Sequence, residues 1–129
     1  MALVLVIDDE EDARRVVEVM LKNAGHDAVL AVDGNDALRQ FRRQHFELVI
    51  CDVFMPDKEG IETLKELRQL DPTVPIIMMS GGAPTAYFWG ATYKDYLAMA
   101  VAFGATRTIE KPFKYSQLIR LLHECLARS

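Results

Sequence analysis

The strongest constraint on the fold of this chain is the regular alternation of short apolar runs with helical patterns. Five runs typical of β-strands are separated by segments whose apolar residues recur at the spacing of an amphipathic helix. The runs are 3–7, 28–32, 48–51, 76–79 and 107–109, and the expected helices are 13–24, 34–41, 61–70, 92–103 and 116–127. Strands that alternate with helices in this way predict a parallel sheet with helices on both faces.

The predicted fold is therefore α/β, with a parallel five-stranded sheet between two layers of helices. The first, third and fourth runs are continuously apolar, as expected for strands that are covered on both faces. Right-handed crossovers leave few topologies, and a flavodoxin-like (βα)5 fold with strand order 2-1-3-4-5 is favoured at this size. Since the 129 residues contain no linker and no internal repeat, we expect residues 1–129 to form one domain.

The composition argues against several classes of protein. A net charge of −4 without any run of Lys or Arg is unlike the basic patch on which nucleic-acid binding depends. No apolar stretch is long enough to span a bilayer, and the first apolar run is too short for a signal peptide. Cys51 and Cys125 lie in apolar runs, which is typical of buried free thiols in a reducing compartment. We expect a cytoplasmic protein that binds neither nucleic acid nor membranes.

Polar side chains stand at the carboxyl ends of four expected strands. Asp8 and Asp9 follow the first strand, Asp52 the third, Ser80 the fourth and Lys111 the fifth. Ligands of such sheets bind beyond the carboxyl ends of the strands, so we expect these five side chains to gather at one edge.

Their chemistry is that of phosphoryl transfer. Clustered carboxylates repel one another unless they take up protons or bind a cation, and Mg²⁺ prefers such oxygen ligands. A carboxylate can act as the nucleophile, while a hydroxyl and an ammonium bind the phosphoryl oxygens. Each residue alone has a simpler explanation: an Asp after a strand is often a helix cap, and the acidic run 8–12 favours a helix N-terminus. The combination indicates a site.

These residues resemble the receiver domain of two-component response regulators, and the resemblance covers essentially the whole chain. It rests on four short motifs, which are Asp8-Asp9, Asp52-Val53-Phe54-Met55-Pro56 with Gly60, Ser80-Gly81 and Lys111-Pro112-Phe113. Because little sequence follows the last expected helix, the chain looks like a single-domain response regulator.

The resemblance implies a role for each residue that would meet the phosphoryl group. Asp52 would be the phosphoacceptor, Ser80 would hydrogen-bond the phosphoryl group and Lys111 would pair with it. Pro112 would fix the peptide bond that aims Lys111, a bond that is often cis in the family. The domain would catalyse only its own phosphorylation and dephosphorylation, so we do not expect an enzyme that turns over a separate substrate.

The resemblance also implies a cofactor and partners. Mg²⁺ would be bound directly by Asp9, Asp52 and the backbone carbonyl of Phe54, and by Asp8 through water. The phosphoryl donor would be a histidine kinase or a histidine phosphotransfer protein. The output would be binding to a downstream protein or onward relay of the phosphoryl group, from a monomer or a weak dimer.

Two features depart from the family pattern. The position three before Lys111 is usually aromatic in the family and is Thr108 here, so an aromatic rotamer switch is not available. The segment 81–91 is longer than usual and carries Tyr87, Phe88 and Trp89. These aromatics either pack back on the protein or form a partner-docking loop, since exposed aromatic patches mark interaction sites.

Alternative functions follow from the same residues. A degenerate receiver could act as a scaffold without phosphorylation, which Thr108 leaves open, or the chain could be a receiver cut from a larger hybrid kinase or regulator. An aspartyl-phosphate hydrolase of the haloacid-dehalogenase kind is disfavoured, because that chemistry needs an acid where Phe54 stands. The three histidines, His26, His45 and His123, have no metal-ligand spacing, and we expect no function for them.

Overall fold

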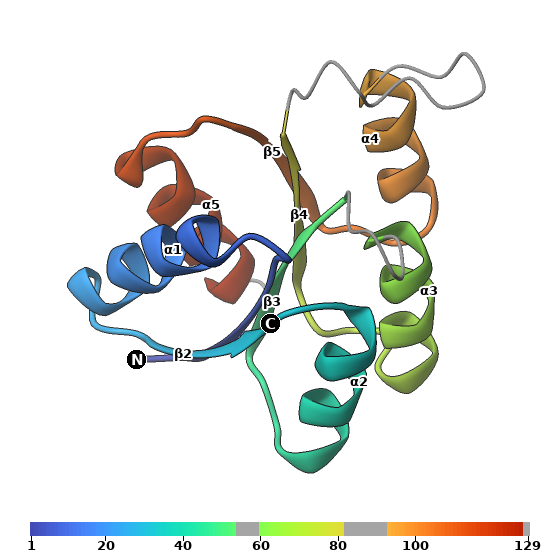
Figure 1. Cartoon of the computed structure of the whole chain (residues 1–129), viewed down its shortest axis with the longest axis horizontal. Helices are drawn as coiled ribbons and strands as arrows, with labels where there is room; N and C mark the ends of the chain where they lie inside the picture. Colours follow the sequence, from blue (N-terminus) through green and yellow to red (C-terminus); the bar gives the residue numbers. More distant parts are fainter. Residues whose placement is uncertain (54–59, 82–92, 128–129) are drawn as a thin grey trace.

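A computed structural model, which describes residues 1–53, 60–81 and 93–127, confirms the predicted three-layer architecture (Figure 1). Its sheet has five strands in the order 2-1-3-4-5, and every neighbouring pair is parallel. The strands are β1 (Leu3–Ile7), β2 (Asp27–Ala31), β3 (Leu48–Asp52), β4 (Ile76–Gly81) and β5 (Arg107–Lys111). The helices are α1 (Glu11–Asn23), α2 (Gly34–Arg43), α3 (Gly60–Leu70), α4 (Tyr93–Ala102) and α5 (Tyr115–Ala127).

The strands differ from the prediction mainly at their carboxyl ends. The apolar runs end at Met79 and Ile109, but backbone pairing continues two residues further and matches Gly81 with Lys111. Polar residues can extend a strand because backbone N–H and C=O groups, and not side chains, form the hydrogen bonds between strands. Ser80 and Lys111 are therefore strand residues, and the sheet itself fixes their positions.

The helices cover the two faces of the sheet unequally. Helices α1 and α5 pack on one face, whereas α2, α3 and α4 pack on the other (Figure 1). Alternate residues of the central strands point into one cluster or the other, as the two-residue period of a strand requires. In β3, for example, Ile50 joins the cluster under α1 and α5, and Cys51 joins the opposite one. Burial on both faces explains why β3 reads as a continuous apolar run.

Local signals in the sequence set the helix boundaries. The carboxylate of Asp33 accepts a hydrogen bond from the backbone N–H of Asp36 at 2.8 Å and caps α2. Gly25 and Gly104 follow the ends of α1 and α4 with φ values of 86° and 112°, which glycine adopts without strain. A side chain at 104 would also contact Arg68, whose guanidinium lies beside that glycine.

Three apolar residues that the helical pattern places inward are partly exposed. Val16, Leu70 and Met99 have exposed fractions of 52%, 44% and 41%. Leu70 is the last residue of α3, and Val16 lines an apolar groove beside Lys111. In the described part of the chain, no helix has both the length and the apolar character needed to cross a membrane.

Candidate functional site

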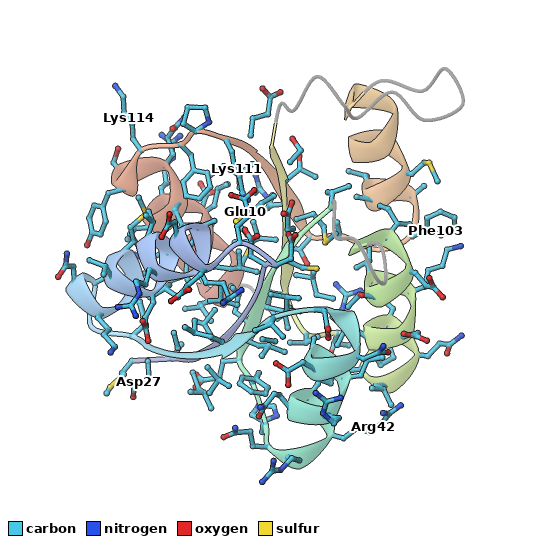
Figure 2. The ribbon with its side chains drawn as sticks, in the orientation of Figure 1. Glu10, Asp27, Arg42, Phe103, Lys111 and Lys114 are labelled. Carbon is cyan, nitrogen blue, oxygen red and sulfur yellow. The ribbon has the colours of Figure 1, made fainter. Side chains whose placement is uncertain are left out.

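Strand register brings the predicted site residues to one edge of the sheet. Asp8 directly follows Ile7, which pairs with Cys51, and Asp52 is the next residue of β3. Asp52 pairs with Met79 of β4, so Ser80 lies one position beyond it. Lys111 ends β5, and Figure 2 shows its side chain at this edge, near Glu10. Four strands that are far apart in sequence thus contribute to a single site.

Asp8 is fully buried, and the protein occupies both of its carboxylate oxygens. Its Oδ1 accepts a hydrogen bond from the backbone N–H of Glu10 at 3.0 Å, and its Oδ2 accepts one from Lys111 Nζ at 2.7 Å. Its backbone carbonyl accepts a further hydrogen bond from Arg14 Nη1 at 2.7 Å. These contacts hold the turn between β1 and α1 in one orientation, so Asp8 is a fixed negative charge at the edge of the sheet.

Lys111 bridges the two buried carboxylates. Its Nζ lies 2.7 Å from Asp8 Oδ2 and 3.5 Å from Asp52 Oδ2. Burial disfavours the charged ammonium, but the negative charge of Asp52 and the hydrogen bond from Asp8 outweigh burial and raise the pKa of Lys111 above its usual value. Lys111 therefore remains a cation at neutral pH, between the two acids whose repulsion it reduces.

Asp9 completes a cluster of carboxylates that suits a divalent cation. Oxygen atoms of Asp8, Asp9 and Asp52 all lie within 4.8 Å of one another. Asp9 is exposed, whereas Asp52 is 5% exposed, so the cluster opens to solvent on the Asp9 side. Carboxylate oxygens are the hard ligands that Mg²⁺ takes in proteins, usually one or two together with waters and phosphate oxygens. The residues present therefore fit Mg²⁺.

Ser80 adds an unusual polar atom next to this cluster. It is 0% exposed, and its hydroxyl oxygen has no hydrogen-bond partner among the described residues. A buried hydroxyl without a partner costs about 1–3 kcal/mol, so such groups are rare in folded proteins unless a ligand satisfies them. An anion that sits between Asp52 and Lys111 would supply the missing partner.

Gly60 explains how α3 can begin so close to Asp52. Its backbone N–H donates to the carbonyl of Val53 at 2.9 Å, and a Cβ at this position would overlap the backbone of Asp52 and Val53. Only glycine permits that approach. The glycine of the motif that contains Asp52 is thus needed for the start of α3 to approach the end of β3.

Cys51 neighbours the site without being a second nucleophile. Its thiol is buried and donates to the carbonyl of Asp52 at 3.3 Å. Burial, with the negative charges of Asp52 and Asp8, raises the pKa of the Cys51 thiol well above its usual value. The thiol therefore stays protonated and unreactive at neutral pH.

An apolar groove of about 500 Å³ lies beside Lys111, between α1 and the segment that follows β5. The sequence did not predict this groove, because the helical pattern indicated that the apolar residues of α1 that line it lie in the core. Its lining consists of Ala13, Val16, Val17, Met20, Lys111, Pro112 and Phe113. The groove places an apolar surface directly next to the charged site.

The structure tests the positions of the other predicted residues unequally. The Lys111–Pro112 peptide bond is cis, as the resemblance implied. Thr108 is half-buried and pairs with Met78 on β4, on the face that α4 covers. Phe54 and the loop residues Tyr87, Phe88 and Trp89 lie outside the described residues, so their predicted roles stay predictions.

Two contacts of this chain could not be read from the sequence. Arg14 reaches the carbonyl of Asp8, and the imidazoles of His26 and His123 meet although 97 positions separate them. Arg14 lies one helical turn into α1, a position at which arginine is ordinarily a solvent-exposed residue. Neither contact has a local motif that would have revealed it.

A scan of family models matches the response regulator receiver domain at residues 4–123. Among curated proteins, the chain is 35% identical over 126 residues to the transcriptional regulatory protein ZraR of Salmonella typhimurium. That match covers 98% of this chain and 26% of ZraR, so the chain spans about a quarter of that relative's length.

Solved structures agree with this match. The receiver domain of NtrX from Brucella abortus superposes with a TM-score of 0.87 at 30% identity, over 98% of this chain and 99% of that one. The chemotaxis response regulator CheY4 of Vibrio cholerae superposes with a TM-score of 0.82 at 31% identity, over 97% and 98% of the two chains. Both neighbours cover nearly the whole of this fold.

Proposed function

Because the chain belongs to the response regulator receiver family of two-component systems, we propose that it accepts a phosphoryl group on Asp52 in a Mg²⁺-dependent reaction. Receiver domains interact with histidine kinases and with downstream effectors. We infer that the donor here is the phosphohistidine of such a kinase or of a histidine phosphotransfer protein. The domain would catalyse only its own phosphorylation and dephosphorylation.

One observation carries this proposal. The buried hydroxyl of Ser80, which has no partner among the described residues, lies at the strand end next to the Asp52–Lys111 pair. A site built only to neutralise three carboxylates would need the lysine but not a buried, unsatisfied hydroxyl. A phosphoryl group on Asp52 supplies oxygens for both Ser80 and Lys111.

The proposed transfer is an in-line displacement at phosphorus. An oxygen of the Asp52 carboxylate forms a bond to phosphorus while the bond from phosphorus to the donor's imidazole nitrogen breaks. The leaving ring nitrogen keeps the electron pair of that bond. The product is an acyl phosphate on Asp52, and negative charge accumulates on the phosphoryl oxygens during the step.

The chain's own residues would stabilise that charge. Lys111 would exchange its contact with Asp52 for a phosphoryl oxygen and keep its hydrogen bond to Asp8. Ser80 would donate to a second oxygen. Asp8, Asp9 and Asp52 would hold Mg²⁺, and the family resemblance implies that Asp8 acts through water. Bound Mg²⁺ would supply further positive charge for the phosphoryl oxygens.

The groove beside Lys111 supports a protein as the donor. It borders the site, and its apolar lining includes Val16, Met20 and Phe113. A donor that presents a histidine to Asp52 must cover this region, and apolar contacts would hold it in register with the site. A small-molecule donor would need only the polar groups.

The alternative of a phosphorylation-independent scaffold keeps one observation in its favour. Thr108, half-buried on β5, is too short for the aromatic switch that the family resemblance implies. Such a scaffold would not require the buried hydroxyl of Ser80, which has no partner among the described residues, so the site favours phosphorylation.

A transfer assay tests the choice of donor. A histidine phosphotransfer protein labelled on its histidine is mixed with the chain, and the label on each protein is followed with and without Mg²⁺. The proposal predicts Mg²⁺-dependent transfer to the wild type and none to Asp52→Asn. Absence of transfer to the wild type from a panel of such donors, or equal labelling of Asp52→Asn, would contradict it.

A further inference from the structure

Two histidines meet at the edge of the sheet that lies opposite Asp52. His26 stands in the turn between α1 and β2, and His123 lies on α5. Their Nε2 atoms are 3.2 Å apart, a hydrogen-bond distance, and the rings meet edge to face. Asp27, the residue after His26, is labelled in Figure 2 at the end of β2 away from Lys111.

The surroundings of His26 fix which of its nitrogens carries the proton. His26 is 7% exposed, and its Nδ1 accepts a hydrogen bond from the backbone N–H of Ala2 at 3.0 Å. Nδ1 must therefore be unprotonated, so the neutral ring carries its proton on Nε2. That Nε2–H donates to His123, whose Nε2 must be the unprotonated nitrogen of its ring. The two hydrogen bonds, from Ala2 to His26 and from His26 to His123, thus exist together only when both imidazoles are neutral.

Protonation of either ring breaks this arrangement. A proton on His123 Nε2 would face the Nε2–H of His26, so two donors would oppose each other. A proton on His26 Nδ1 would face the N–H of Ala2 in the same way. We propose that the His26–His123 pair is a proton-sensitive latch that fastens α5 to the edge of the sheet opposite the phosphoacceptor.

The charged groups around the pair do not compensate for the cost of protonating His26. Burial, then the neighbouring His123 and the N-terminal amine, lower the pKa of His26, and only Glu47 acts in the opposite direction. The carboxylate of Glu47 accepts a hydrogen bond from the backbone N–H of Leu3 at 3.0 Å. His26, His45 and Asp71 line one cavity, and Asp71 accepts hydrogen bonds from Thr73 and Val74.

On α5 itself, Glu124 pairs with Arg107 and not with His123. Among the described residues, no carboxylate forms an ion pair with either imidazole of the pair.

The sign of the pH effect follows from this lowered pKa. As the pH falls below the ordinary histidine value of 6.5, the unfolded chain takes up a proton at position 26 before the folded chain does. The folded state, and with it the closed latch, therefore loses stability as the pH falls. The latch is closed at pH 7.5 and opens in mildly acidic solution.

A shared metal ion fits the pair less well than a shared proton. Two Nε2 atoms 3.2 Å apart could both bind Zn²⁺, but a metal on Nε2 would force the proton of His26 onto Nδ1. That proton would then face the N–H of Ala2, whereas metal-binding histidines normally direct their second N–H at an acceptor. The hydrogen bond from Ala2 thus favours the proton latch.

Hydrogen exchange of α5, measured on the unphosphorylated chain, tests this inference independently of the proposed function. Protection of the α5 amides, corrected for intrinsic exchange, should fall between pH 7.5 and pH 5.5 by up to about tenfold for each pH unit below 6.5. His123→Ala should reduce protection at pH 7.5, where the latch is closed, and much less at pH 5.5, where the latch of the wild type is already weakened. His123→Gln, which keeps an acceptor for His26, should restore most of it at pH 7.5.

His45→Gln serves as the matched control, because His45 is exposed and outside the pair, and it should respond to pH like the wild type. Equal α5 protection of the wild type at both pH values, or loss of the response in His45→Gln, would overturn the latch. So would nitrogen chemical shifts that place the proton of His26 on Nδ1. Zn²⁺-dependent protection that His123→Ala abolishes would identify a metal site in place of the latch.

Discussion

At the scale of single residues, Lys111 contributes a positive charge to the site, and Ser80 contributes a hydroxyl that can donate a hydrogen bond. Lys111 is useful before any ligand arrives, because it reduces the repulsion between Asp8 and Asp52. Ser80 has no such role in the metal-free protein, since its hydroxyl has no partner among the described residues. The two residues should therefore respond in opposite ways to substitution.

Replacing Lys111 by methionine should destabilise the metal-free protein and strengthen cation binding. Loss of the lysine removes the positive charge between two buried carboxylates, at a cost of about 1–3 kcal/mol in the free energy of unfolding. The greater negative charge of the site should tighten Mg²⁺ binding about tenfold, while phosphorylation of Asp52 becomes slower. Urea unfolding without Mg²⁺ and calorimetric Mg²⁺ titration measure the two effects.

Lys114→Met is the control for this experiment, because Lys114 is exposed and points away from the protein in Figure 2. It should change neither quantity.

The pKa of Lys111 is raised above its ordinary value of 10.5. Its contribution to stability should therefore be complete below pH 10.5 and lost only as the pH rises through the higher pKa of the folded state. A Lys111→Met protein as stable as the wild type at pH 7 would contradict this view of the charge balance.

Replacing Ser80 by alanine should leave the protein at least as stable as the wild type. Removal of a buried hydroxyl that lacks a partner relieves its desolvation cost, so we expect a gain of about 0–1 kcal/mol in the free energy of unfolding. Phosphorylation should nevertheless slow, because one donor to the phosphoryl group is lost. Urea unfolding and the rate of phosphorylation by acetyl phosphate are the measurements.

The described residues offer a matched control for Ser80. The hydroxyl of Thr63 on α3 is also buried and without a partner among them. Thr63→Val should leave stability at least as high as in the wild type, like Ser80→Ala, but should not change the phosphorylation rate. If both substitutions slow phosphorylation equally, Ser80 has no specific role in the site.

At the scale of secondary-structure elements, Arg68 ties the C-terminal part of α3 to the segments that follow it. Its guanidinium donates to the carbonyls of Gly104 and Val74 at 2.8 and 2.6 Å and to the hydroxyl of Thr106 at 3.3 Å. The same hydroxyl accepts from the N–H of Ile76 at 3.0 Å. One side chain thus connects α3, the start of β4 and the turn before β5.

Arg68→Met should therefore cost about 2–3 kcal/mol in the free energy of unfolding, because it leaves partly buried carbonyls without donors. Arg42, near the C-terminal end of α2 and exposed, provides the control, and Arg42→Met should stay within about 0.5 kcal/mol of the wild type. Chemical denaturation of both variants decides the point. Equal stability of the two variants would mean that Arg68 does not connect these elements.

The surface of α1 allows the two kinds of phosphoryl donor to be separated. Val16 lines the groove beside Lys111, whereas Val19 is equally exposed on the same helix but does not line it. Val16→Asp should slow transfer from a phosphorylated histidine protein by about tenfold or more and leave phosphorylation by acetyl phosphate unchanged.

Val19→Asp should leave both reactions unchanged. A Val16→Asp protein that accepts phosphoryl groups from a histidine protein at the wild-type rate would exclude the groove as the docking surface.

At the scale of the whole molecule, the sequence predicted the fold because local and global signals agree. The apolar β3 run, the cap at Asp33 and the glycines at 25 and 104 each indicate the element boundary that the structure shows. The strand order followed because right-handed crossovers leave few alternatives. The site followed from the fold, since ligands of parallel sheets bind beyond the carboxyl ends of the strands.

What the sequence could not predict depends on contacts between distant elements. Helical periodicity placed Val16 inward, but it cannot tell a core from a groove that other segments leave open. The pairing of His26 with His123 requires the relative position of α5 and the α1–β2 turn, which no local pattern contains. The same holds for the hydrogen bond between Arg14 and Asp8.

The most direct test of the central claim is the intact mass of the protein after incubation with acetyl phosphate. Wild type and Asp52→Asn are compared with Mg²⁺ and with the ion removed by chelation. We predict one phosphoryl adduct on the wild type, only when Mg²⁺ is present, and none on Asp52→Asn. An adduct that forms without Mg²⁺ or persists in Asp52→Asn, or no adduct on the wild type with Mg²⁺, would contradict the account.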